Sequence, residues 1–137
     1  MSSDVFFDTN IIVYFASESD PKAHISAQLL KAGGVVSVQV LNEFTRVGLR
    51  KRRLTFVEIH KTIDAVRAVC KVVALTLETH ERGLAYAERY KLGVFDAMIV
   101  AAAVLAGCTT LYTEDMHDGL VIDGVTMRNP FSGLDAA

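Results

Sequence analysis

The chain has 137 residues, enough for one domain with a hydrophobic core. Hydrophobic residues make up 51% of it and charged residues 22%, a composition that excludes a disordered protein. The formal net charge of −2 excludes any argument for nucleic-acid binding from bulk charge alone. The most hydrophobic stretch, Leu92 to Cys108, is short for a bilayer span of about 20 residues and contains Asp96, so we expect a buried helix and no membrane segment. The amino terminus lacks the basic and apolar regions of a signal peptide, and we therefore expect a cytoplasmic protein.

The first half of the chain alternates short apolar runs with helical patterns. Gly33 and Gly34 are suited to end a helix, and Ser37 is suited to cap the next one. In chain order we expect a strand over residues 5–7, a short helix over 11–15, an amphipathic helix over 22–31, a strand over 35–36 and a helix from 37 toward 50.

The second half continues the alternation. Thr55 and Glu58 form a capping-box pattern, which predicts that a helix begins after Thr55. The pattern then predicts, in order, the end of that helix at 69, a strand over 71–74, helices over 79–90 and 95–106, a strand over 110–112 and a weak strand over 125–127. Strands separated by helices predict an α/β fold, with a central parallel sheet of four to five strands between two helical layers. We expect one domain over residues 1–131 and a frayed tail over 132–137.

Four acidic residues lie in apolar surroundings, where a lone carboxylate is costly to desolvate. Asp8 and Asp115 each follow a predicted strand, Glu43 interrupts the apolar face of a helix, and Asp96 precedes a long apolar stretch. Ligands of parallel sheets bind beyond the carboxyl ends of the strands, and helix starts tend to face the same edge. We therefore expect all four acids at one rim, where a shared divalent cation compensates their charge.

Each acid alone also has an ordinary structural interpretation. Asp8 is typical of a turn at the end of a strand, and the adjacent acids Glu114 and Asp115 are typical of a solvated loop. Asp96 is typical of the first turn of a helix, where the dipole stabilises a carboxylate. Glu43 can instead lie at a partly exposed helix edge and pair with Arg46 or Arg50. The common placement of the four acids, rather than any one of them, predicts a site.

Oxygen ligands without paired histidines or cysteines favour Mg²⁺ or Mn²⁺ over zinc, and the four histidines show no paired spacing. Such an ion, held by a few carboxylates, orients and activates water and neutralises charge that develops on phosphorus. The reaction class that fits this site is phosphodiester hydrolysis.

A run of basic residues lies downstream of Glu43 and comprises Arg46, Arg50, Lys51, Arg52 and Arg53. One interpretation is a patch that positions substrate phosphates beside the site. The alternative is a solvated helix end or a docking surface for a protein partner. Few aromatic residues interleave the run, so it does not indicate base stacking.

Five segments together resemble the PIN-domain ribonucleases, particularly the VapC-like toxin subunits of VapBC-type toxin–antitoxin systems. They are FFDTN at 6–10, SVQVLNEF at 37–44, FDAMIVAAA at 95–103, LYTEDM at 111–116 and NPF at 129–131. The resemblance covers nearly the whole chain, and its specificity comes from the order and spacing of the segments. The acidic positions of the family fall on Asp8, Glu43, Asp96 and Asp115, and Thr113 occupies its hydroxyl position.

The resemblance implies a Mg²⁺- or Mn²⁺-dependent endoribonuclease, the toxin component of a toxin–antitoxin pair. It also implies a homodimer and a small antitoxin protein that covers the active-site groove. Asp8, Asp96 and Asp115 are expected as the main metal ligands, with Glu43 as a further ligand or a water-orienting group. Asn10 and Thr113 are supporting candidates, and the candidate substrate-binding residues are Arg46, Arg50, Lys51 and Arg53.

Two other functions compete with this expectation. An aspartyl-phosphate phosphatase also places an acid at a strand end, but it needs a second aspartate two positions on, where this chain has Asn10. A non-catalytic RNA- or protein-binding PIN-like module would use the acids only as electrostatic contacts. Dependence on a divalent metal separates the nuclease from the binding module.

Overall fold

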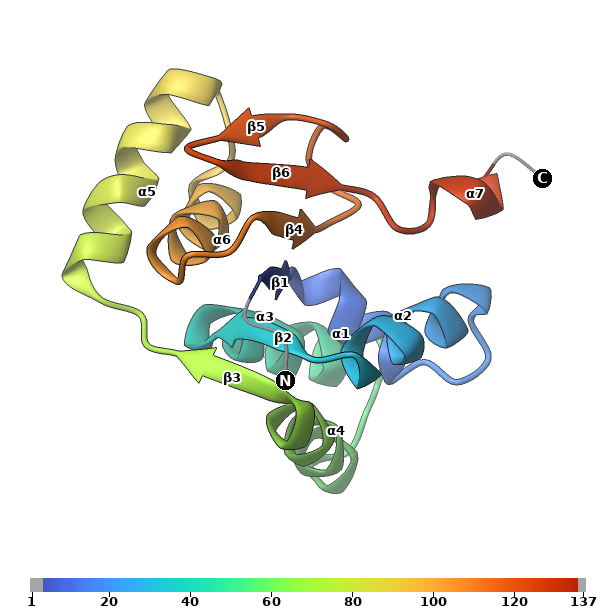
Figure 1. The fold of residues 1–137 in the computed structure, drawn as a ribbon. Helices are drawn as coiled ribbons and strands as arrows, with labels where there is room; N and C mark the ends of the chain where they lie inside the picture. The colour runs from blue at the N-terminus through green and yellow to red at the C-terminus, as the bar shows by residue number, and fades with distance from the viewer. Residues whose placement is uncertain (1–3, 136–137) are drawn as a thin grey trace.

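Strands and helices alternate along residues 4–135, the part of the chain that the computed structural model describes (Figure 1). The strands are β1 (Val5–Phe7), β2 (Gly34–Ser37), β3 (Cys70–Val73), β4 (Thr110–Tyr112), β5 (Val121–Ile122) and β6 (Val125–Arg128). The helices are α1 (Thr9–Phe15), α2 (Pro21–Lys31), α3 (Val38–Arg50), α4 (Phe56–Val69), α5 (Leu77–Tyr90), α6 (Val94–Leu105) and α7 (Ser132–Asp135).

The six strands form one sheet in the order β3-β2-β1-β4-β6-β5. Every neighbouring pair is parallel except β5 and β6. β1 lies in the interior of the sheet, and its last residue, Phe7, is in register with Tyr112 at the end of β4. The carboxyl ends of these two strands therefore meet at one edge of the sheet, and the chain segments that follow them lie side by side.

The predicted fold class is confirmed, with one strand more than the four to five expected. The additional strand, β5, has two residues and pairs antiparallel with β6 through a tight turn. Asp123 and Gly124 form that turn with φ values of 44° and 86°. An Asp-Gly pair is the usual sequence signal of such a hairpin. The pair therefore predicts the turn, but β5 itself, with two residues, is too short to show a strand pattern.

The helices pack as two groups around the sheet. Contacts join α1, α2, α3 and α4 to one another, and α5 packs along α6, which contacts β2, β4 and β6 (Figure 1). The predicted caps form: Ser37 accepts a hydrogen bond from the Val40 N–H, and Thr55 and Glu58 form a reciprocal capping box. These caps fix where α3 and α4 begin, because they satisfy N–H groups that the helix itself leaves unpaired.

The core lies between the sheet and these helices. Phe6 and Phe7 of β1 and Leu111 of β4 are fully buried, and residues 97–103 of α6 are buried without interruption. This confirms the buried helix expected from the apolar stretch. Among residues 4–135 no helix has the length and hydrophobicity that a membrane span requires.

The carboxyl-terminal segment differs from the frayed tail expected over residues 132–137. Residues 132–135 form the short helix α7, and the Ser132 hydroxyl donates a hydrogen bond to the Asn129 carbonyl. Phe131, directly before α7, is fully buried and packs edge-on against the Tyr14 ring, with ring centroids 5.2 Å apart. Packing of this aromatic pair holds the start of α7 against α1. Residues 136–137 lie outside the described part.

Candidate metal site at the carboxyl edge of the sheet

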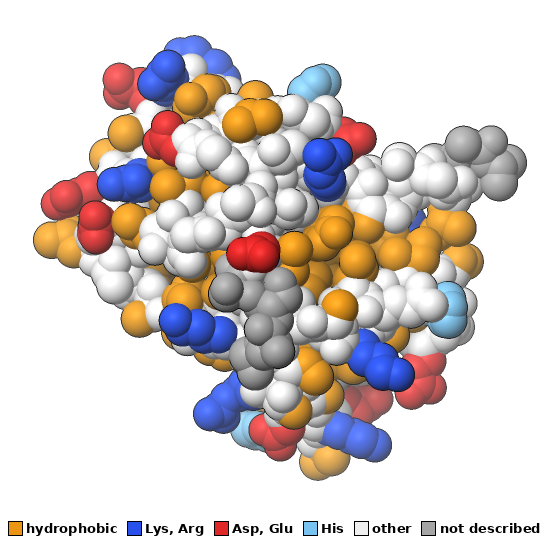
Figure 2. All heavy atoms as spheres, viewed as in Figure 1, with side chains coloured by type: hydrophobic (Ala, Val, Ile, Leu, Met, Phe, Trp, Pro, Cys, Tyr) orange, Lys and Arg blue, Asp and Glu red, His pale blue; other side chains and the backbone are white. Residues whose placement is uncertain are grey.

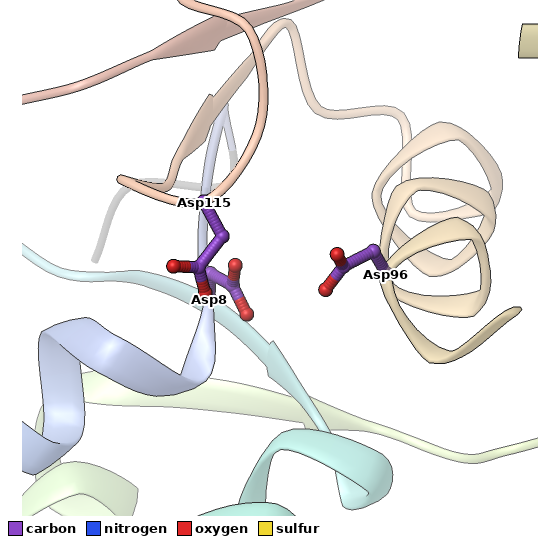
Figure 3. Close-up of side chains that lie close together, drawn as sticks. All are labelled: Asp8, Asp96 and Asp115. Atoms are coloured by element: carbon purple, nitrogen blue, oxygen red, sulfur yellow. The ribbon is translucent and has the colours of Figure 1, made fainter. Parts of the chain in front are cut away.

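Three carboxylates converge at the carboxyl edge of the sheet (Figure 3). Asp8 directly follows β1 and caps α1, Asp115 lies on the loop after β4, and Asp96 lies in the first turn of α6. Asp8 and Asp115 lie next to each other, and Asp96 faces them from the helix. Each residue offers one oxygen atom, and these atoms lie within 4.8 Å of one another. The fold thus brings together acids that are separated by most of the chain.

Asp8 is held in a fixed orientation inside the protein, with 2% of its surface exposed. Its Oδ1 accepts a hydrogen bond of 2.6 Å from the Thr9 N–H, and its Oδ2 accepts one of 2.7 Å from the Thr113 hydroxyl. Burial raises the pKa of Asp8 to about 7, although these two hydrogen bonds oppose the shift. The negative charges of Asp96 and Asp115 raise that pKa further.

The hydroxyl of Thr113 connects two of the carboxylates. It donates to Asp8 and accepts a hydrogen bond of 3.2 Å from the Asp115 N–H. Asn10, on α1, donates from Nδ2 to Asp115 Oδ2 over 2.7 Å. Both supporting candidates from the sequence therefore lie in the site and fix the position of its acids.

The structure places Asp96 where both of its interpretations apply, in the first turn of α6 and facing the other acids. The N-cap of α6 is Gly93, and no side chain makes a cap hydrogen bond there, so Asp96 does not cap the helix. Its carboxylate is half-buried, and burial, followed by the negative charge of Asp115, raises its pKa. The Asp96 carboxylate thus faces the other two acids, and a cation bound among the three would compensate their negative charge.

Glu43 lies beside this group rather than within it. Among the described residues, the group of oxygens within 4.8 Å contains Asp8, Asp96 and Asp115. Burial raises the pKa of Glu43, a hydrogen bond from Gln39 opposes the shift, and the charges of Asp96 and Asp115 add to it. The bond from Gln39 Nε2 to Glu43 Oε2 measures 3.3 Å. Glu43 therefore lies at the border of the site, close enough for the charges of Asp96 and Asp115 to affect its pKa.

The donor set fits a hard divalent cation. The three residues supply only carboxylate oxygens, which are the ligands that Mg²⁺ and Mn²⁺ prefer. Burial raises the pKa of Asp8 and of Asp96, the negative charges of the neighbouring acids add to both shifts, and a bound cation would favour the charged form of each carboxyl. Asp8, Asp96 and Asp115 would hold the ion.

The basic run lies at the end of α3 and in the segment after it, and its five members are exposed. Arg46 lines a pocket together with Glu43, and its charge lowers the pKa of that carboxylate. Lys51 is the C-cap of α3, and the Arg52 guanidinium lies 5.9 Å from the Tyr14 ring centroid. Charges of both signs alternate over the face seen in Figure 2, which agrees with the small net charge.

Sequence reasoning missed a group of residues that fastens the loop of Asp115. Glu114 accepts hydrogen bonds from the Tyr14 hydroxyl and from Lys22 Nζ, the latter over 2.8 Å. Lys22 Nζ also lies 5.0 Å from the Tyr14 ring centroid. Adjacent acids at 114 and 115 suggested a solvated loop, whereas Glu114 is partly buried and anchors that loop to α1 and α2. Nothing in the spacing of these residues signals the contact.

The protein thus belongs to the class of α/β proteins with a mostly parallel sheet, and its acidic site lies at the carboxyl edge of that sheet. The family model of the PIN domain matches residues 5–117, so the chain belongs to the PIN-domain family. No curated protein matches the sequence.

Solved structures share the fold. A toxin–antitoxin complex from Klebsiella pneumoniae contains a chain that is 24% identical, with a TM-score of 0.69 over 93% of this chain and 98% of its own. VapC20 of Mycobacterium tuberculosis, a toxin that cleaves the sarcin–ricin loop, is 18% identical, with a TM-score of 0.63 over 82% and 90% of the two chains. VapBC2 from Rickettsia felis, bound to a promoter DNA fragment, gives 18% identity and a TM-score of 0.65 over 91% and 97%.

Proposed function

We propose that this protein is a Mg²⁺- or Mn²⁺-dependent endoribonuclease, the toxin component of a toxin–antitoxin pair. The observation that carries the proposal is the convergence of Asp8, Asp96 and Asp115, within 4.8 Å, at the carboxyl edge of a PIN-domain sheet. An acidic site of this kind repels a polyanion unless a cation is present, which is why the proposal includes the metal.

The residues of the site have separate tasks in this proposal. Asp8, oriented by Thr113 and Thr9, and Asp96 and Asp115 would hold the ion. When bound, the ion lowers the pKa of water and neutralises charge on the phosphodiester. Glu43 has a raised pKa and lies at the border of the site, which suits a carboxylate that orients the attacking water and takes up its proton. Arg46, next to Glu43, is suited to hold a substrate phosphate.

The proposed partners follow from the structures that share the fold. One is a toxin–antitoxin complex and another is a VapBC pair bound to promoter DNA. We extend this to a small antitoxin that binds the present protein, to a homodimer, and to a cytoplasmic location in which both the antitoxin and RNA are available.

Cleavage of a mixed pool of single-stranded and structured RNA tests the function. The wild-type protein is expected to cleave with Mg²⁺ or Mn²⁺ and to stop with EDTA. Asp8→Asn, which removes the charge but little volume, is expected to abolish cleavage and keep the fold. Asp64→Asn is the matched control, because Asp64 is an exposed acid on α4, away from the site.

Two outcomes would contradict the proposal. Metal-dependent cleavage that persists in a folded Asp8→Asn protein would remove Asp8 from the site. A folded, antitoxin-free wild type that binds RNA but cleaves neither the pool nor tRNA and rRNA would instead be a non-catalytic binding module.

A further inference from the structure

A pocket of about 370 Å³ adjoins the acidic site. Its lining combines apolar, amide and charged side chains, from Gln39, Asn42, Glu43, Arg46, Leu75 and Phe95. The volume is within the range of small-ligand sites, about 300–1,000 Å³. The pocket shares Glu43 with the border of the site, and Phe95 directly precedes Asp96 in the chain. A ligand in this pocket would therefore lie next to the reacting phosphodiester.

The fold places an aromatic ring beside the basic run, which the order of residues in the sequence does not show. Phe95 is the second residue of α6 and is 66% exposed, and Arg46 of α3 lines the same pocket. Gln39 Nε2 donates to the Phe95 carbonyl over 3.4 Å and to Glu43 over 3.3 Å. This amide joins α3 to the start of α6 and so holds the backbone of Phe95 beside Glu43.

The chemistry of the lining selects one kind of ligand. Exposure of one aromatic residue is common on protein surfaces and does not by itself indicate a site. Here the ring lies in a pocket with the amides of Gln39 and Asn42, which can pair with the edge of a base, and with a guanidinium suited to a phosphate. An aromatic face, amide groups and a cation next to an acidic metal site match a nucleotide better than an apolar peptide.

We propose that this pocket binds one unpaired nucleobase of the RNA, next to the cleaved phosphodiester, with the base stacked on Phe95. The inference rests on the proposed function and adds to it a pocket and a residue, Phe95, that hold one base of the substrate. A base inside a duplex cannot leave its stack without a cost of a few kcal/mol, so the enzyme selects single strands or loops. Arg46 holds the phosphate of the same nucleotide, which explains why a ring and a cation share the pocket.

Binding of a short single-stranded RNA by proteins that also carry Asp8→Asn tests the pocket without cleavage. Phe95→Ala is expected to weaken binding by about fivefold to 150-fold, which is the effect of losing the stack of one base on an aromatic ring. Phe95→Tyr, which keeps a ring, is expected to retain affinity. Phe56→Ala is the matched control. Phe56 is the first residue of α4, Phe95 is the second residue of α6, and both side chains are 66% exposed. Equal affinity of the Phe95→Ala and Phe56→Ala proteins would overturn the inference.

Phe95→Trp gives a second, independent readout. The chain contains no tryptophan, so this variant carries a single indole in the pocket. The single-stranded RNA is expected to quench its fluorescence, and the same RNA annealed to its complement is expected to have little effect. A Phe56→Trp protein should respond to neither. Quenching that is equal with the duplex, or absent, would overturn the proposal of an unpaired base.

These outcomes are distinguishable from failure of the proposed function. If the wild type cleaves RNA with metal and Phe95→Ala cleaves it with an unchanged KM, the function stands and the pocket proposal is wrong. If the wild type does not cleave, the function is wrong, while single-strand-specific quenching of Phe95→Trp still supports the base pocket. A Phe95→Ala protein that changes only its oligomeric state would assign the pocket to a second copy of the chain and overturn the proposal.

Discussion

At the scale of single residues, Asp8 has the least ordinary environment of the site. Its carboxylate is nearly fully buried, keeps two hydrogen bonds and has a pKa raised to about 7. In the metal-free protein this acid is therefore partly protonated near neutral pH. The proton takes the place that we assign to the cation, so metal binding and protonation at Asp8 compete.

Asp8 makes the stability of the metal-free protein depend on pH. Its pKa rises from 3.8 when unfolded to about 7 when folded, so between these values the folded state binds more protons and stability falls as the pH rises. The contribution amounts to at most about 4 kcal/mol, at about 1.4 kcal/mol per pH unit. We expect Asp8→Asn to be more stable than the wild type at pH 8 in EDTA, and the difference to shrink toward pH 4. Urea unfolding at pH 4 and pH 8 measures the difference in stability between the two proteins. A stability difference that is equal at both pH values would contradict the assigned pKa.

Thr113 is expected to position Asp8 through its hydroxyl. Thr113→Val keeps the shape but leaves Asp8 Oδ2 without a donor and the Asp115 N–H without an acceptor, at a cost of about 1–3 kcal/mol. Thr113→Ser keeps the hydroxyl and serves as the control. Urea unfolding gives the stability, and calorimetric titration with Mn²⁺ gives the affinity, which we expect to fall for valine and to persist for serine. An unchanged Mn²⁺ affinity for Thr113→Val would show that the hydroxyl does not position the acid.

At the scale of elements, the site depends on how closely α6 packs against its neighbours. Gly83 on α5 permits this approach, because a Cβ there would lie 2.5 Å from Met98 Sδ and 3.1 Å from Met98 Cα. The second atom belongs to the backbone of α6 and cannot turn away. Asp96 lies two residues before Met98, so the α5–α6 contact also sets the position of a candidate ligand.

Gly83→Ala is expected to destabilise the protein by about 1–3 kcal/mol. An alanine favours the helix itself by up to about 1 kcal/mol, but overpacking against α6 exceeds that gain. Gly133→Ala is the control, because a Cβ at Gly133 meets no atom within 4 Å. Thermal unfolding measures the stability of both proteins and of the wild type. A Gly83→Ala protein as stable as the wild type would mean that α5 and α6 separate without cost.

Most of the fold was predictable from local patterns, because each buried strand and each cap has a signal in adjacent residues. Asp8 and Asp115 could be placed at one edge from the parallel strands before them. Two arrangements had no such signal, because they bring together residues far apart in the sequence: the contacts of Glu114 with Tyr14 and Lys22, and the pocket that Phe95 and Arg46 both line. The sequence also placed Glu43 with the other acids, whereas the structure sets it at their border, since α3 begins at Val38 and Glu43 lies about one and a half turns into it.

At the scale of the whole molecule, the candidate ligands come from three segments that lie far apart in the sequence. Asp8 follows β1, Asp115 belongs to the loop after β4, and Asp96 belongs to α6 (Figure 3). A cation bound to all three stabilises the folded state only, because the unfolded chain does not hold them together.

Addition of Mn²⁺ at pH 8 is expected to raise the Tm of the wild type by several degrees. An ion at a hundred times its Kd stabilises the folded state by about 2.7 kcal/mol. The shift should disappear in Asp96→Asn and decrease below pH 7, where protons compete at Asp8. Differential scanning calorimetry measures the Tm, and the exposed-acid variant Asp64→Asn should respond like the wild type. An equal shift in Asp96→Asn would place the ion elsewhere.

The order of the strands also determines when the site can exist during synthesis. β1 is made first, yet it lies between β2 and β4, so one of its edges stays open until β4 has been translated. Asp8 and Thr113 are 105 residues apart, which corresponds to on the order of ten seconds of translation. A nascent chain that stops before the β4 loop contains Asp8 but neither Thr113 nor Asp115. Whatever chemistry the site performs therefore cannot begin until the ribosome has synthesised the chain through the β4 loop.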